Sequence, residues 1–454
     1  MRDAGAEWPV VVMKLRNWSG AKGLCYPVLN YGQPIREEPM NKAKPYEISK
    51  HKVLEAFQRV KANKGAAGID GESLEEFETN LKRNLYKIWN RMSSGSYFPP
   101  TVKAVEIPKK DGGKRMLGVP TVSDRVAQMT AKIYFEPQVE PHFHSDSYGY
   151  RPGRSAADAL GIVRQRCWKY DWVLEFDIKG LFDNIDHELL MKAVRKHTDN
   201  PWVILYIQRW LKASFQMPDG TINERTKGTP QGGVISPILS NLFLHYAFDI
   251  WMDRTHPDKP FARYADDAVA HCRSKVAAEK LHDNLKDRLI ECGLELHPTK
   301  TRIVYCKDDD RRGEYPETKF DFLGYTFRAR RSKNKYGKHF INFTPAVSNK
   351  ASKAMRQTIH GWRMHLKPDK ALEDLSKMFN PVIRGWINYY GRFYKSELYS
   401  VLKYMNQALI RWVQRKYKKF GKHKQRGTDW LGQIARREQK LFAHWKMGIY
   451  PGAG

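Results

Sequence analysis

A regular pattern of hydrophobic and polar residues begins at Ser49. Apolar side chains recur at helical spacing through residues 50–63, where Ser49 stands at the position of an N-terminal cap, and again through 74–92. Two strand-like segments follow at 102–108 and 115–120, joined by the turn KKDGG. The pattern predicts two helices and then a flexible basic hairpin, whose tip either grips a triphosphate or is an ordinary solvated turn.

Strands and helices alternate through the middle of the chain. Residues 172–178 (WVLEFDI) predict a buried strand, and 275–292 an amphipathic helix. The loop TPQGG at 229–233 opens a long helix that is expected to end near Trp251. Further strand-like segments lie at 294–306 and 320–327.

From Arg328 onwards the pattern is helical and basic. Three amphipathic stretches, 350–366, 371–393 and 396–420, predict a small helical bundle. Residues 1–47, by contrast, show no sustained periodicity. We expect them to form an extension that is mobile until bound, with Met40 as an alternative start to Met1.

The composition favours a folded chain with hydrophobic cores, because 41% of the 454 residues are hydrophobic and 28% are charged. The formal net charge of +30 indicates a polyanionic partner, with nucleic acid ahead of an anionic membrane. Residues 328–454 hold 29 Lys and Arg against 6 Asp and Glu, interleaved with Trp and Tyr. This imbalance favours a nucleic-acid interface over a merely solvated basic face.

Two other classes of protein are disfavoured. No stretch of eighteen or more apolar residues is present, so no transmembrane helix is predicted. The five cysteines are widely scattered without a Cys-x-x-Cys pair, which argues against a disulfide framework and against a zinc ribbon. We therefore expect a cytoplasmic, nucleoid-associated protein that is not secreted.

Adjacent carboxylates stand out in the segment FARYADDAVAH. Asp266 and Asp267 lie in a short apolar run, where acids are costly unless a cation such as a divalent metal neutralises them. A polar hairpin turn is the alternative. The strand over 172–178 delivers Asp177 at its carboxyl end, and if the two strands are neighbours, Asp177 and Asp266 converge. Such a pair suits two-metal phosphoryl transfer.

At these motifs the chain resembles the bacterial group II intron reverse transcriptases/maturases, from about residue 48 to about residue 445. The family's blocks occur in order: ANKGAAGIDG, EIPKKDGGKRMLGVPTVSDR, SYGYRPGRSAADAL, EFDIKGLFDNIDH, GTPQGGVISPILSNLFL, RYADD, LELHPTKT, FLGYTF and GWINYYGRF. The resemblance implies an α+β fold of the right-hand polymerase type, with fingers and an antiparallel-sheet palm before an all-helical thumb/maturase domain and a short basic tail. The implied ranges are an extension over 1–47, fingers with a template lid over 48–170, palm over 171–327, thumb/maturase over 328–410 and tail over 411–454.

The resemblance also implies roles for individual residues. Asp177 and Asp266 would chelate two Mg²⁺ ions, for which Mn²⁺ could substitute, with Asp267 alongside and the backbone carbonyl of Ile178 as a further ligand. The residues implied in binding the incoming dNTP are Lys109 and Arg115 on the hairpin, Phe182 as a steric gate against the ribose 2′-hydroxyl, Gln231 and Lys300. For the last three the plainer alternatives are a core phenylalanine, a helix-capping loop residue and a surface charge.

The implied partners are intron RNA in a ribonucleoprotein, a DNA target and primer, and the RNA–DNA duplex, without a membrane; a homodimer is left open. The residues expected to contact nucleic acid are Asn63, Lys64, Gly65, Arg151, Arg154, Arg384, Trp386, Arg392, Arg411, Arg415, Lys416, Lys418 and Lys419. No cysteine follows Cys306, so we expect a member without the metal-binding nuclease domain that some relatives carry. The expected activity is RNA-directed DNA synthesis with a role in intron splicing and mobility. The alternatives are a maturase whose polymerase is incidental and a domesticated relative without an intron.

Overall fold

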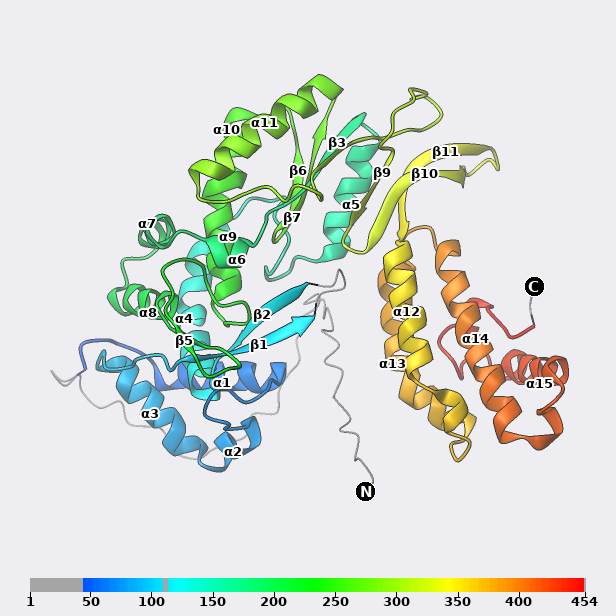
Figure 1. Cartoon of the computed structure of the whole chain (residues 1–454), viewed down its shortest axis with the longest axis horizontal. Coiled ribbons are helices and arrows are strands. Elements are labelled where there is room, and N and C mark those ends of the chain that lie inside the picture. The colour runs from blue at the N-terminus through cyan, green and yellow to red at the C-terminus, as the bar shows by residue number, and fades with distance from the viewer. Residues whose placement is uncertain (1–43, 109–112, 453–454) are drawn as a thin grey trace. The chain divides into compact units, whose positions relative to one another are not determined.

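The computed structural model describes residues 44–108 and 113–452 (Figure 1). The chain forms two compact units. The first unit consists of the residues up to Asp158 together with Gly180–Trp251, and the second of Ala159–Lys179 together with Met252 onwards. The chain thus passes between the units three times, which differs from the contiguous ranges expected for fingers and palm. The predicted extension lies almost wholly outside the described residues, as does Lys109.

Helices make up most of the first unit. The predicted helix over 50–63 is confirmed, and Ser49 is its N-cap, although its side chain makes no capping hydrogen bond. The helix expected over 74–92 is instead two helices that meet at Asn80, whose φ of −117° and ψ of 35° interrupt the helical path. The helices of this unit are α1 (Lys50–Asn63), α2 (Leu74–Thr79), α3 (Leu81–Ser93), α4 (Val122–Val139), α6 (Leu181–Asn184), α7 (His187–His197), α8 (Pro201–Leu211) and α9 (Ser236–Leu244). The long helix expected to end near Trp251 continues from α9 through a π-helical segment, His245–Asp249, into α10 (Ile250–Thr255).

A four-stranded sheet in the first unit contains the predicted hairpin, which is confirmed. Strands β1 (Val102–Pro108) and β2 (Lys114–Val119) pair antiparallel, and β4 (Phe215–Gln216) adds to β1 in parallel before β5 (Ile222–Asn223). Val102, Ala104 and Phe215 form the small core beneath it.

The second unit contains the strand predicted over 172–178. Its antiparallel sheet has the order β6-β7-β3-β8, built from β6 (Phe261–Tyr264), β7 (Asp267–Cys272), β3 (Trp172–Asp177) and β8 (Arg302–Tyr305). Helix α11 (Lys275–Glu291) packs against β3 and β7 (Figure 1), and α5 (Ala156–Cys167) leads into β3.

The region after Arg328 does not begin as a helix, so the expectation that residues 328–410 are all helical is wrong. Strands β9 (Lys319–Phe322), β10 (Tyr325–Lys333) and β11 (His339–Val347) form a second antiparallel sheet, and β10 and β11 make a long hairpin. The rings of Phe320 and Phe327 stack with centroids 4.7 Å apart, and Phe343 stacks on Phe320 at 6.1 Å. This buried aromatic stack forms the core under the β10–β11 hairpin.

The predicted helical bundle follows the hairpin. Its helices are α12 (Asn349–Gly361), α13 (Leu372–Tyr390), α14 (Ser396–Lys416) and α15 (Lys424–Arg437). The final segment is not simply a basic tail, because Phe442 and Trp445 are fully buried in the core of the bundle. His444 is buried beside them and hydrogen-bonds from Nε2 to Asn406 Oδ1 at 2.7 Å. Across the described ranges, no helix has the length and apolar character needed to cross a membrane.

Candidate active site

Three carboxylates lie at the same end of the two central strands, β3 and β7, of the β6-β7-β3-β8 sheet. Asp177 at the end of β3 stands opposite Asp267 at the start of β7 in the antiparallel register. Asp266 lies in the turn between β6 and β7, where Ala265 has a φ of 59°. The prediction that the strand bearing Asp177 neighbours the Asp266–Asp267 hairpin is therefore confirmed.

A lysine from a distant loop is inserted into this group of acids. Lys300 Nζ donates a hydrogen bond to Asp177 Oδ2 at 2.6 Å. Desolvation acts to lower the pKa of Lys300, but the hydrogen bond to Asp177 and the charges of Asp177, Asp267 and Asp266 raise it overall. Lys300 is thus the resident counter-charge of the site, which is more than the surface charge that was its plainer alternative.

The carboxylates also act on one another. Desolvation by the surrounding protein, and then the charges of Asp266 and Asp177, raise the pKa of Asp267 to about 7. The Asp267 side chain is nevertheless exposed to solvent, so we attribute the raised pKa mainly to repulsion from the neighbouring carboxylates. The group carries more negative charge than Lys300 alone neutralises, which is the condition under which a cation binds favourably.

The donor set fits a hard divalent metal such as Mg²⁺, which prefers carboxylate and carbonyl oxygens. Around Ile178 the pairing bonds run from Lys179 N to Glu295 O and from His297 N to Asp177 O, so this pairing leaves the carbonyl of Ile178 itself unused. In the part of the chain that the structure describes, however, the acids do not close into a ready-made cluster of three ligands, and Lys300 holds one oxygen of Asp177. Metal binding would require Lys300 to move aside.

The predicted nucleotide-binding residues of the first unit share one hydrogen-bonded framework. The Gln231 carbonyl accepts from Gly118 N at 2.7 Å, three residues along β2 from Arg115. The Phe182 carbonyl, in turn, accepts from Thr229 N at 2.6 Å. The loop that carries Gln231 is therefore fastened to the hairpin strand on one side and to α6 on the other.

Two glycines make this fastening possible. Gly232 has a φ of 111°, and a Cβ there would stand 2.4 Å from the carbonyl oxygen of Gly118. Gly228 has a φ of 79°, and a Cβ there would stand 2.6 Å from the carbonyl oxygens of Phe182 and Asp183. Any larger residue would push the loop away from its two supports.

A buried polar network, which the sequence did not predict, extends from helix α4 and supports the loop that carries Gln231. Gln128 on α4 accepts from Val234 N at 2.8 Å and from Ile235 N at 3.3 Å, and it donates to Asp124 Oδ2 at 2.9 Å. Asp124 is held in turn by Trp210 Nε1 at 2.8 Å. The sequence contains little signal for it, because α4 carries several other polar and charged residues besides Asp124 and Gln128.

The predicted template lid lies against α4. Asn63, Lys64 and Gly65 are exposed, as a contact surface requires. Arg125 Nη2 donates to the Ala66 carbonyl at 2.9 Å, and a Cβ at Gly65 would stand 2.1 Å from Arg125 Nη1. The glycine therefore lets the loop close over the arginine.

The expectation that Arg151 contacts nucleic acid is not supported. Its side chain is buried, and its guanidinium donates to Glu140 Oε1 at 2.8 Å and to the carbonyls of His144 and Ser147 at 2.6 and 2.8 Å. Arg151 instead fixes its own loop. Arg154, from the same motif, is partly exposed.

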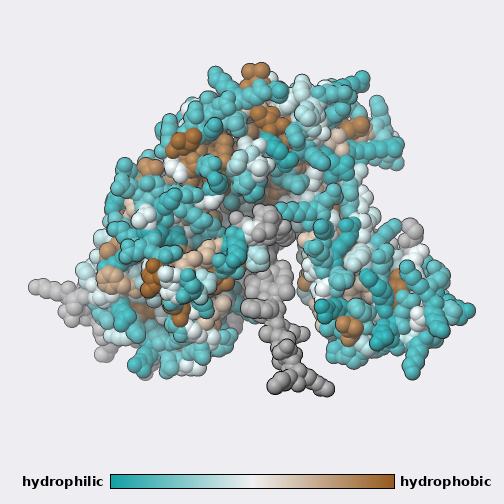
Figure 2. Space-filling model, viewed as in Figure 1, coloured by the Kyte–Doolittle hydropathy of each residue, from teal (hydrophilic) through white to brown (hydrophobic). Residues whose placement is uncertain are grey.

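The basic residues predicted to contact nucleic acid in the helical bundle divide into two groups. Lys416 Nζ donates to the carbonyls of Pro368 and Lys370, both at 2.8 Å, and Trp386 stacks on Trp362 with centroids 5.6 Å apart. Both side chains therefore have structural roles. The residues with exposed side chains are Arg384, Arg392, Arg411, Arg415, Lys418 and Lys419. Figure 2 shows that the visible face of this bundle is largely hydrophilic.

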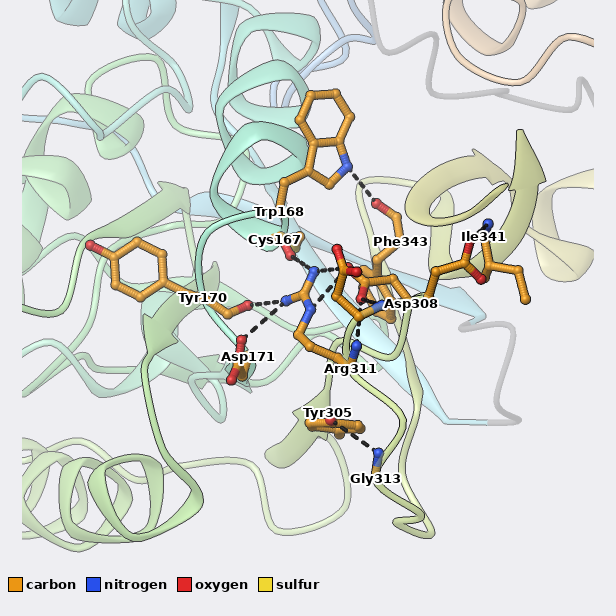
Figure 3. A network of polar contacts seen from close by, with 12 residues as sticks. Cys167, Trp168, Tyr170, Asp171, Tyr305, Asp308, Arg311, Gly313, Ile341 and Phe343 are labelled. Atoms are coloured by element: carbon orange, nitrogen blue, oxygen red, sulfur yellow. Dashed lines mark hydrogen bonds and ion pairs between the residues drawn. The ribbon is translucent and has the colours of Figure 1, made fainter. Parts of the chain in front are cut away.

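A second network missed in the sequence holds the entry to β3 (Figure 3). Arg311 donates from Nη1 to the Tyr170 carbonyl at 2.8 Å and from Nη2 to the Cys167 carbonyl at 3.0 Å, while Asp308 Oδ2 accepts from its Nε at 2.9 Å. These contacts fix the segment between α5 and the strand that delivers Asp177.

Two known families match the regions that contain the β6-β7-β3-β8 sheet and the helical bundle. Residues 107–327 match the family described as reverse transcriptase (RNA-dependent DNA polymerase). Residues 352–430 match the group II intron maturase-specific domain. The chain is a reverse transcriptase of the group II intron maturase family.

Individual relatives of this group II reverse transcriptase agree with that assignment. Protein YkfC of Escherichia coli is 29% identical over 69% of the chain and 89% of its own length. The group II intron-encoded protein LtrA of Lactococcus lactis is 32% identical over 50% of the chain, which spans 39% of LtrA. Nuclear intron maturase 4 of Arabidopsis thaliana is 26% identical over 35% of the chain and 20% of its own length.

Proposed function

We propose that this reverse transcriptase copies group II intron RNA into DNA from a primer in target DNA, and that it also binds the intron RNA to assist splicing and mobility. The observation that carries the polymerase part is the register of Asp177 opposite Asp267, with Asp266 in the adjoining turn and Lys300 among them. The match to the maturase-specific domain and the basic surplus after Arg328 support the RNA-binding part.

The acids of the sheet edge provide the chemistry in this proposal. Two Mg²⁺ ions held there would supply activation of the primer 3′-hydroxyl and neutralisation of the leaving pyrophosphate. Asp177 and Asp266 would hold them, with the Ile178 carbonyl and Asp267 alongside. Lys300, displaced from Asp177, keeps a positive charge close to the site where phosphate charge develops.

The residues of the first unit select and orient the nucleotide. Arg115 on β2 holds the triphosphate, Gln231 supports it, and Phe182 excludes a 2′-hydroxyl. Phe182 follows Asp177 by five residues in the sequence.

Primer extension on an RNA template tests the polymerase part. We expect Asp177→Asn and Asp266→Ala each to lower the rate by at least about 100-fold, the lower end of what the loss of one charge-stabilising group costs. Asp287→Ala, an exposed acid on α11, is the matched control and should leave the rate unchanged. Full activity of either active-site variant would sink the polymerase claim and favour a maturase whose polymerase is incidental.

The RNA-binding part has its own test. Affinity of the full chain for intron RNA should fall steeply with salt, because each phosphate contact by Lys or Arg releases counterions. A flat salt dependence would contradict it. Intron RNA sequence flanking the reading frame would separate a mobile element from a domesticated relative.

A further inference from the structure

A pocket of about 520 Å³ opens in the helical bundle between the end of α12, the short helix η3 (Met364–Leu366) and α14. Its volume is within the range of about 300–1,000 Å³ that is usual for small-ligand sites. The buried side chains that line it are aliphatic: Ile359, Met364 and Ala408. The pocket is distinct from the carboxylate site, and all of its lining residues fall inside the maturase-specific match.

Hydrogen bonds next to the pocket hold its surrounding helices together without a ligand. Trp412 Nε1 on α14 donates to the Lys367 carbonyl at 2.9 Å, and Lys416 Nζ donates to the carbonyls of Pro368 and Lys370. These three bonds fasten the connection between α12 and α13 onto α14. The pocket is therefore a fixed feature of the bundle and not a gap between loosely joined helices.

One residue of the pocket adopts an uncommon backbone conformation. Arg363 has a φ of 44°, in the left-handed region that non-glycine residues rarely occupy. Such a conformation is strained and persists only where its surroundings enforce it. Here Arg363 N donates to the His360 carbonyl at 3.1 Å and the Arg363 carbonyl accepts from Leu366 N at 2.9 Å. These bonds fix the backbone of Arg363, whose side chain is among those that line the pocket.

The exposed side chains of the pocket are cationic. Among the residues that the structure describes, Arg363, Arg411 and Arg415 line it together with two histidines, and no acidic residue does. Within the described residues none of the three arginines forms an ion pair, whereas many other basic side chains of the chain do. A strongly basic rim above an aliphatic floor matches a ligand that has phosphate at one end and a largely apolar plane at the other.

We propose that this pocket captures one unpaired nucleotide of a bound RNA, with the base on Ile359, Met364 and Ala408 and the flanking phosphates on the arginines. Inorganic phosphate would leave the aliphatic floor without a partner, and a base inside a double helix could not enter. Guanidinium planes also stack on unstacked bases, which is how single-stranded RNA is commonly read. The inference rests on the proposed binding of RNA by this domain and adds the form of RNA that it prefers.

Three labelled RNA hairpins test this with the full chain in fluorescence anisotropy. They share one stem, which is fully paired in the first, carries a single bulged adenosine in the second, and carries an abasic bulge in the third. We expect the adenosine bulge to bind at least about fivefold tighter than both others, the low end of what seating one base on a protein surface gives. Equal affinity for all three, or an abasic bulge as tight as adenosine, would overturn the capture of a base.

Two variants assign the preference to the pocket. Ala408→Trp fills it, and Arg363→Gly removes a guanidinium while suiting the left-handed backbone, so the second variant relieves strain and remains folded. Both should abolish the preference for the bulge and leave binding of the paired stem within about twofold. Lys403→Gln, an exposed cation elsewhere on α14, should keep the preference.

The outcomes separate two failures. If Ala408→Trp and Arg363→Gly both retain the preference, the pocket is not the site. If wild-type protein binds none of the hairpins at low salt, the proposed RNA-binding function itself fails, and the pocket proposal fails with it.

Discussion

Replacement of Gln128 by leucine should show how much of the fold depends on the buried network under the nucleotide loop. Leucine has nearly the same size as glutamine, so packing on α4 is largely preserved. The change removes the acceptor for Val234 N and Ile235 N, and the donor to Asp124 Oδ2. The bonds to Ile235 N and Asp124 are buried, where water cannot readily replace the amide, and the bond from Val234 N is partly buried.

The expected loss follows from the bonds. An unsatisfied buried N–H costs about 1–3 kcal/mol, and the partly buried Val234 N, bonded at 2.8 Å, falls at the lower end of that range. The longer 3.3 Å bond from Ile235 N adds less. A hydrogen bond to a charged group contributes about 1.5–3 kcal/mol, which bounds the loss at Asp124. The free energy of unfolding should therefore fall by about 3–6 kcal/mol, a large share of a typical stability of about 5–15 kcal/mol.

Urea denaturation followed by tryptophan fluorescence measures this loss, since Trp210 donates to the same carboxylate. Gln58→Leu, an exposed glutamine on α1, controls for the side-chain exchange and should change stability by less than about 0.5 kcal/mol. Where the Gln128→Leu variant remains folded, its KM for dNTP should rise more than its kcat falls, because the loop bearing Gln231 loses its support. A loss below about 1 kcal/mol would refute the role given to Gln128.

Other substitutions probe separate parts of the molecule. Gly232→Ala should raise KM for dNTP by forcing the loop from β2, whereas Gly220→Ala, with a φ of 88° but open space around it, reproduces only the backbone strain; equal effects of the two would contradict the close-approach argument. Burial lowers the pKa of His444 from its ordinary 6.5 to about 3, so below pH 6.5 the unfolded chain takes up a proton that the folded chain refuses and stability is lost as the pH falls. His444→Gln should make that pH dependence shallower by up to about 1.4 kcal/mol per pH unit in urea titrations between pH 7 and 5, and an unchanged slope would exclude His444 as its source. Phe182→Ala should raise kcat/KM for ribonucleotides relative to dNTPs, and unaltered discrimination would remove Phe182 from the gate.

The sequence predicted strands well where a short segment rich in apolar residues lies next to a turn signal, as in β1, β2, β3 and β7. The strand-like segment predicted over 320–327 covered only the start of β10, and the rest was missed because four of the nine residues in Tyr325–Lys333 are Arg or Lys. The core of that hairpin comes from the stacking of Phe320, Phe327 and Phe343, which lie on three different strands. Such a core is a property of the folded sheet and not of any one segment.

The candidate site shows the same division. Asp177 and Asp266 were predictable because each ends or turns a short apolar strand. The network of Gln128 was not, since its partner Val234 lies 106 residues away and an isolated glutamine does not indicate which backbone it will meet. The contact of Arg311 with Tyr170 spans 141 residues and was missed for the same reason. The sequence could not show that Arg151 holds its own loop, because an arginine in such a motif can equally well bind a phosphate.

The position of β3 in its sheet has a consequence for the order in which the protein is made. Both neighbours of this hydrophobic strand, β7 and β8, follow it in the sequence, and β7 is complete only at Cys272. At about 5–20 residues per second, a ribosome needs roughly 5–20 s to cover the distance from Asp177 to Cys272. During that time β3 has no strand partner, while Gly180–Trp251 already completes the first unit. The nascent chain therefore carries an unpaired apolar strand for seconds, and this interval is when chaperones or slow growth should most improve its yield.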